Sequence, residues 1–157
     1  MKRKNFLIIF FVIVGGLILL RADIANKPQE IVQQDHGFFN LQVGENNLEV
    51  EVVSTLESFK LGLGKRDEIG SDGMLFVFSS RRIASFWMKD MRFGIDMIWI
   101  DGDEVVEITK NIPPPNRALP QQELELYLPE SPVDKVLEVK ARDSDGLGIE
   151  VGDKVKL

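Results

Sequence analysis

The chain has 157 residues, of which 44% are hydrophobic and 28% are charged, a composition typical of one globular domain with short extensions. It contains no cysteine, which excludes disulfide frameworks, thiolate nucleophiles and cysteine-based zinc or iron–sulfur sites. Four of the 19 basic residues and none of the 25 acidic residues lie in the first 21 positions, so the rest of the chain carries a net charge of −10. Such an acidic body repels phosphate backbones and anionic lipid, which argues against a nucleic-acid partner.

The N-terminus predicts a membrane segment. Lys2 to Lys4 precede an apolar run over 6–20, which is close to the ~20 residues that a spanning helix needs. Arg21 follows the run directly and no small-x-small cleavage site is present, so residues 1–22 are interpreted as an uncleaved signal anchor. The positive-inside rule then gives a single-pass membrane protein with a cytoplasmic N-terminus and an extracytoplasmic body. The alternative is a signal peptide, whose cleavage would release a secreted or periplasmic protein; a protease-accessibility assay on whole cells tests this topology.

Residues 23–47 are mostly polar and predict a linker that holds the folded body away from the membrane. His36, the only histidine of the chain, lies in this linker, where a lone histidine is typically solvated rather than catalytic or metal-bound. Four apolar residues near the end of the linker allow an additional edge strand of the body: Phe38, Phe39, Leu41 and Val43.

Residues 48–157 are expected to form the folded domain. Ser54 and Glu57 match a capping box, which predicts a helix that runs through Phe59 and Leu63 and ends near Arg66. Short apolar or alternating runs predict strands over 48–53, 74–78, 84–88, 95–100, 104–109, 136–141 and 154–157.

Several of these segments carry more specific expectations. The continuous apolar run 74–78 is expected to be buried on both faces. Asp101-Gly102 predicts a tight hairpin between the strands on either side. The proline-rich segment 112–120 cannot enter a central strand and is expected to form a surface excursion that 121–128 continues. The predicted fold class is α+β: a compact, mostly antiparallel, barrel-like sheet of about six short strands with one or two short helices, plus the N-terminal apolar helix.

Ordered motifs through this body resemble one known family. They are Ser54-x-x-Glu57, Gly62-Leu63-x-x-Arg66, Gly73-Met74-Leu75-Phe76-x-Phe78, Ser85-Phe86-Trp87-Met88-Lys89, Ile95-Asp96-x-x-x-Ile100-Asp101, Val136-Leu137-Glu138-Val139 and Gly148-Ile149-x-x-Gly152-Asp153-x-Val155. The chain from about residue 48 to 155 resembles the DUF192 family of small, uncharacterised prokaryotic domains. The resemblance implies a small, mostly β fold that often follows a signal sequence or membrane anchor, and it implies no established activity.

The best candidate for a ligand site is the turn at Trp87, Met88 and Lys89, together with Arg66 and Asp96. Tryptophan and methionine offer a flat, polarisable apolar surface, while the two cations are suited to a small anionic ligand and Asp96 to orienting one of them. The competing structural interpretation places Trp87 and Met88 in the core and pairs Lys89 or Arg66 with Asp96 to hold a loop.

No catalytic, metal-binding or cofactor-binding residue is assigned. The only histidine is in the linker, so a histidine-based dyad or triad is not expected in the body. The acidic segments 101–104 and 143–146 lack the register of a calcium loop and are explained by turns. P-loop and Rossmann glycine patterns are absent from the sequence.

The sequence therefore favours a membrane-anchored extracytoplasmic module that binds a ligand or a protein through the Trp87 region or the proline-rich excursion. One alternative is an enzyme that acts on an envelope glycan or small molecule through acidic residues near Asp96. Another is a structural accessory of an envelope complex. The enzyme requires Trp87, Arg66 and Asp96 to line one open cleft, whereas binding requires that Trp87→Ala weakens ligand capture while the fold is retained.

Overall fold

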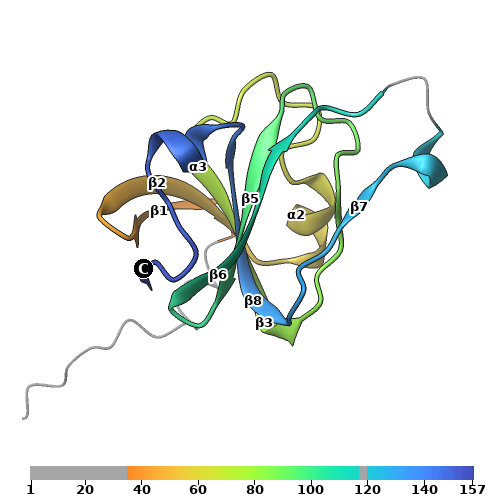
Figure 1. Cartoon of the computed structure of the whole chain (residues 1–157). Helices are drawn as coiled ribbons and strands as arrows, with labels where there is room; N and C mark the ends of the chain where they lie inside the picture. The colour runs from red at the N-terminus through yellow and green to blue at the C-terminus, as the bar shows by residue number, and fades with distance from the viewer. Residues whose placement is uncertain (1–34, 117–119) are drawn as a thin grey trace, which may run out of the picture.

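The computed structural model of the chain describes residues 35–116 and 120–157. A curled sheet dominates it, with seven strands in the order β6-β5-β8-β3-β2-β1-β9, and a separate two-stranded sheet pairs β4 with β7 (Figure 1). The elements are β1 (Gly37–Val43), β2 (Asn46–Val53), α2 (Leu56–Leu61), β3 (Gly73–Arg82), β4 (Phe86–Trp87), β5 (Ile95–Asp101), β6 (Glu104–Ile112), the 3₁₀ helix η1 (Gln121–Glu123), β7 (Leu126–Tyr127), β8 (Val133–Lys140), α3 (Asp143–Gly146) and β9 (Val155–Lys156).

Most neighbouring strands are antiparallel, which confirms the mostly antiparallel, barrel-like sheet expected from the sequence. The exception is the pair β2–β3, which is parallel from Val50↔Gly73 to Val53↔Phe76. Parallel strands need a crossover connection, and α2 lies in this one. The crossover places α2 against β3, where the ring centroids of Phe59 and Phe76 are 6.0 Å apart.

The sheet buries apolar side chains on both of its faces. Side chains alternate between the two faces of a strand, so Met74 and Phe76 of β3 enter one core cluster while Leu75 and Val77 enter the other. The first cluster contains Leu41, Val50, Leu137 and Ile149, and the second contains Met97 and Trp99. This confirms that the apolar run 74–78 is buried on both faces.

The predicted helix is present but shorter than expected. Its N-cap is Thr55 rather than Ser54, and the residue that completes the capping box is Ser58 rather than Glu57. The Thr55 hydroxyl accepts from the Ser58 backbone N–H at 3.1 Å, and the Ser58 hydroxyl accepts from the Thr55 N–H at 3.1 Å. The helix ends at Leu61 because Gly62 takes a positive φ of 45°, so the expectation that it continues to Leu63 is wrong.

The tight hairpin is present between β5 and β6, with its loop one residue later than predicted. Asp101 pairs with Glu104, so the two loop residues are Gly102 and Asp103. Gly102 has a φ of 60°, a conformation that glycine adopts without the clash of a Cβ atom.

Two strands of the structure, β1 and β7, are not among the seven predicted from the sequence of the body. β1 lies between β2 and β9, so the four apolar residues near the end of the predicted linker do join the sheet, although not at its edge. β7 lies within the segment expected to continue the surface excursion, and it pairs with β4 through Phe86↔Tyr127 and Trp87↔Leu126.

The predicted N-terminal apolar helix lies outside the described residues, as do linker residues 23–34. Over residues 35–116 and 120–157, no helix has the length and hydropathy required to cross a bilayer. The signal anchor thus stays a prediction from the sequence.

Candidate functional site

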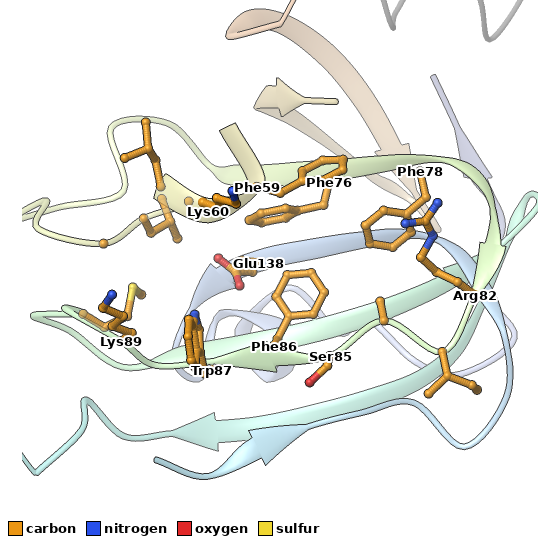
Figure 2. A pocket seen from close by; sticks show the side chains of 17 residues that line it. Phe59, Lys60, Phe76, Phe78, Arg82, Ser85, Phe86, Trp87, Lys89 and Glu138 are labelled. Atoms are coloured by element: carbon orange, nitrogen blue, oxygen red, sulfur yellow. The ribbon is translucent and has the colours of Figure 1, made fainter. Parts of the chain in front are cut away.

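A cavity of about 350 Å³ opens between α2 and β4. Its walls come from α2, from the glycine-containing turn after it, from β3, and from the segment that contains β4, while β8 supplies its floor (Figure 2). The lining residues are Phe59, Lys60, Leu61, Gly62, Leu63, Gly64, Phe76, Phe78, Arg82, Ile83, Ala84, Ser85, Phe86, Trp87, Lys89, Met91 and Glu138. Its volume lies in the range of small-molecule sites.

Four phenylalanine rings form the apolar walls. Phe76 and Phe78 are two residues apart on β3 and therefore point to the same side of the strand. Phe59 of α2 meets Phe78 edge to face, with ring centroids 5.4 Å apart, and Phe86 of β4 meets Phe76 in the same way at 5.0 Å. Because each ring is held by another ring, the walls are preformed rather than dependent on a ligand.

Trp87 and Lys89 lie at the mouth of the cavity. Trp87 is 43% exposed and is held in place by the short pairing of β4 with β7. The Nζ atom of Lys89 lies 5.6 Å from the centroid of the Trp87 ring, within the range of a cation–π contact. The structure thus brings together two of the five residues predicted for the ligand site.

Glu138 lies at the floor, with its carboxyl group directed into the cavity between the phenylalanine rings (Figure 2). The residue is only 5% exposed, and burial raises the pKa of its carboxyl group from 4.5 to about 8. No hydrogen bond or ion pair joins this carboxyl group to another described residue. Glu138 is therefore mostly protonated at neutral pH and can both donate and accept a hydrogen bond inside the cavity.

Glu138 is the acid of the cavity lining. A carboxyl group with a pKa of about 8 can exchange a proton near neutral pH. The residues that line the cavity, all of them in the described part of the chain, include no histidine and no second carboxylate to act as its partner. Hydrolytic mechanisms that rely on a pair of acids or on an acid and a base therefore lack a second group here.

The other three predicted site residues do not line the cavity. Met88 is buried in the second core cluster, as the structural interpretation of this residue required. Arg66 forms a two-pronged ion pair with Glu51, with N–O distances of 2.6 and 3.0 Å. The hydrogen bond from Arg66 lowers the pKa of the Glu51 carboxyl group, which also contacts His36 at 2.7 Å.

Asp96 is fully buried and anchors the end of β6 and the start of α3. Its carboxylate accepts hydrogen bonds from the backbone N–H groups of Asn111, Arg142 and Ser144 and from the Ser144 hydroxyl, at 2.6 to 3.1 Å. Asn111 and Arg142 both have positive φ values, so these bonds hold the backbone in conformations that such residues rarely adopt. Trp87, Arg66 and Asp96 do not share a cleft, which removes the geometry on which the enzyme alternative depended.

Glu138 was not predicted as a site residue, although it stands within a family-like motif of β8. The alternation of the strand offered no signal, because Asp134, Glu138 and Lys140 share one face with Val136, a pattern that is typical of a solvent-facing side. The sequence could not show that this face meets a cavity instead of packed side chains.

Comparisons with known proteins agree with the fold and the motifs. The family model of DUF192, described as an uncharacterised ACR, matches residues 39–157. A crystal structure from Sinorhizobium meliloti 1021, of a protein provisionally described as a transcription regulator, is 25% identical with a TM-score of 0.69, over 78% of this chain and 95% of that one. A protein of unknown function from Novosphingobium aromaticivorans DSM 12444 is 27% identical with a TM-score of 0.68, over 76% and 85% of the two chains. No curated protein matches.

The family match begins at Phe39, within β1, and continues to the last residue of the chain. It therefore includes every element that surrounds the cavity, and it confirms the resemblance carried by the sequence motifs. This chain belongs to the DUF192 family.

Proposed function

We propose that this domain binds a small molecule with a flat, apolar body in the cavity between α2 and β4. The observation that carries the proposal is the carboxyl group of Glu138, which lies at the floor of an aromatic-walled cavity and has no hydrogen-bond partner among the described residues. Its oxygens are open to the cavity, so they are available to a ligand. A ligand that bonds to Glu138 while its body contacts the phenylalanine rings combines a hydrogen bond with apolar burial.

A small molecule fits better than a protein segment because the cavity is compact, at about 350 Å³, and its polar group lies at the floor. The walls are preformed, and the mouth is bordered by Trp87, which is suited to stacking on a flat ligand. A role in DNA binding is not carried over from the Sinorhizobium protein, because a net charge of −6 opposes association with nucleic acid. The membrane location rests on residues 1–22 alone, and the binding proposal does not depend on it.

6-Hydroxynaphthalene-2-carboxamide, a flat neutral compound with a polar group at each end, is the probe that tests this function. Calorimetric titration of the full chain in mild detergent, with a detergent blank subtracted, is expected to show one site. Trp87→Ala should weaken the affinity about tenfold because the ring that covers the mouth is lost. Near-UV and far-UV circular dichroism should show that the fold is retained, since Trp87 is exposed and lies in a two-residue strand.

Phe38→Ala is the matched control, because Phe38 is an exposed aromatic residue of β1 that does not line the cavity. It should leave the affinity for the carboxamide unchanged. The proposal is wrong if the probe does not bind, or if the Trp87 and Phe38 variants bind it equally well. Unfolding of the Trp87 variant would instead support a purely structural role for this residue.

A further inference from the structure

The mouth of the cavity carries three cations without acidic partners. Lys60, Arg82 and Lys89 all line it, and the only acid among the lining residues is Glu138 at the floor. In the described part of the chain none of the three has a carboxylate within ion-pair distance. In contrast, Arg66, Arg81, Arg92, Lys110, Lys135 and Lys154 all pair with acids.

Four other described cations also lack an ion pair: Lys65, Lys140, Arg142 and Lys156. What distinguishes Lys60, Arg82 and Lys89 is that all three surround one opening. Three unpaired cations around one opening create a local positive potential that attracts anions. The mouth is also apolar: Leu61 is 60% exposed and Ile83 is 47% exposed beside the rim. The rim therefore suits a molecule that has both an acid group and an apolar body.

The cations occupy different ends of the opening. Figure 2 shows Arg82 at one end and Lys60 and Lys89 toward the other, with Glu138 between them. Arg82 is held over the Phe78 ring, 5.3 Å from its centroid, and donates a hydrogen bond to the Ser80 carbonyl. The ammonium group of Lys60 has no hydrogen bond or ion pair to a described residue, and that of Lys89 has only the cation–π contact with Trp87. The two lysines are thus the cations most available to a ligand.

The floor does not oppose a negatively charged ligand. Burial keeps the pKa of Glu138 at about 8, so its carboxyl group is mostly uncharged at pH 7. A ligand that carries its acid at the mouth therefore meets cations at the rim and a neutral hydrogen-bonding group below, without repulsion between two like charges.

We propose that the cavity selects anionic amphiphiles, small molecules that combine a flat apolar body, a polar group that bonds to Glu138 and one acid group, and that Lys60 and Lys89 hold the acid group at the mouth. This inference rests on the proposed function, because it assumes that the cavity is the binding site. It adds the charge of the ligand and the residues that recognise that charge.

A pair of compounds of nearly the same shape that differ in charge tests the inference. 6-Hydroxynaphthalene-2-carboxylate and 6-hydroxynaphthalene-2-carboxamide both carry a hydroxyl group for Glu138, and calorimetry on the full chain in detergent measures both. At pH 7 the carboxylate is expected to bind about tenfold more tightly. The double variant Lys60→Gln/Lys89→Gln should remove most of this preference, while its affinity for the carboxamide should change by less than about twofold.

The matched control is Lys140→Gln/Lys156→Gln, which removes the same charge from two exposed lysines outside the cavity. This control should keep the preference for the carboxylate, and raising the salt concentration should reduce that preference in the unmodified chain. Equal affinities for the two compounds would overturn the inference and leave the proposed function intact. So would an undiminished preference in the Lys60/Lys89 variant, or an equal loss in the control variant. If neither compound binds, or Trp87→Ala changes neither affinity, the proposed function fails as well.

Discussion

Glu138 and Glu51 are both buried glutamates on the sheet, and their surroundings move their pKa values in opposite directions. The bidentate hydrogen bonds from Arg66 lower the pKa of Glu51, so this residue is charged and bound to its partner at neutral pH. Glu138 has burial without a partner, which raises its pKa to about 8. One acid therefore contributes to stability as a carboxylate, whereas the other is tolerated only when it is protonated.

The Glu138 shift predicts how stability depends on pH. Between pH 4.5 and about 8 the native state keeps a proton that the unfolded chain has lost, so the free energy of unfolding falls as the pH rises. The loss over this window is at most about 5 kcal/mol, and it is complete above the folded pKa. Glu138→Gln cannot ionise, so urea denaturation at pH 5, 6.5 and 8 should show a weaker decline than in the unmodified chain.

Other groups also titrate in this window, so the difference between the two proteins is the informative quantity. Glu49→Gln, at an exposed position of β2, is the control and should follow the pH dependence of the unmodified chain. Parallel pH profiles for the Glu138 variant and the unmodified chain would show that the buried carboxyl group is not protonated in the native state.

The short helix α2 shows how one element shapes the site. Although it has only six residues, it contributes Phe59 to the aromatic wall of the cavity and Lys60 to the charged mouth. A helix this short is marginal by itself and depends on its caps and on tertiary packing. The Thr55 and Ser58 capping box fixes its start, and the positive φ of Gly62 ends it next to the Phe76 ring.

Two substitutions distinguish the capping box of Thr55 and Ser58 from the box of Ser54 and Glu57 that the sequence predicts. Thr55→Ala should lower the free energy of unfolding by about 1–2 kcal/mol, because the N-terminal N–H of the helix and the side chain of Asp35 both lose a bond. Glu57→Ala, which removes any side-chain bond back to the cap, should cost less than about 0.5 kcal/mol, because Ser58 and not Glu57 completes the box. Urea denaturation measures both variants, and a larger loss in the Glu57 variant would favour the cap at Ser54.

At the scale of the whole molecule, β1 links the two ends of the folded domain. It pairs with β2 from Gly37↔Val52 to Val43↔Asn46 and with β9 through Gln42 and Val43. Leu41 and Val43 are fully buried in the first core cluster. The folded body therefore starts before residue 48, the position at which the sequence composition placed its boundary.

Two truncations test this boundary. The fragment 35–157 keeps β1 and should unfold cooperatively with the stability of the full chain. The fragment 48–157 loses the burial of Leu41 and Val43, each worth about 1.5–3 kcal/mol. It also removes β1 from between β2 and β9, which separates β9 from the sheet and leaves one edge of β2 unpaired. Because a domain of this size is stable by only about 5–15 kcal/mol, this fragment should be mostly unfolded in far-UV circular dichroism. A cooperative thermal transition equal to that of 35–157 would contradict the prediction.

Four features could be predicted from the sequence alone: the family, the strand-rich body, the hairpin at Gly102 and the burial of the run 74–78. These features depend on local periodicity, turn chemistry and ordered motifs, which neighbouring residues specify. The sequence also identified Trp87 and Lys89 correctly as neighbours, because they are two residues apart on one turn.

Which chemical groups share a site could not be predicted in this way, because it depends on tertiary contacts. Arg66 forms an ion pair with Glu51, and Asp96 accepts hydrogen bonds from the start of α3. Glu138 lines the same cavity as Phe59 and Phe86. These contacts join residues that are distant in the chain, and they depend on strand order and on the crossover through α2. The sequence specifies how each strand alternates, but which strands become neighbours depends on the packing of the entire chain.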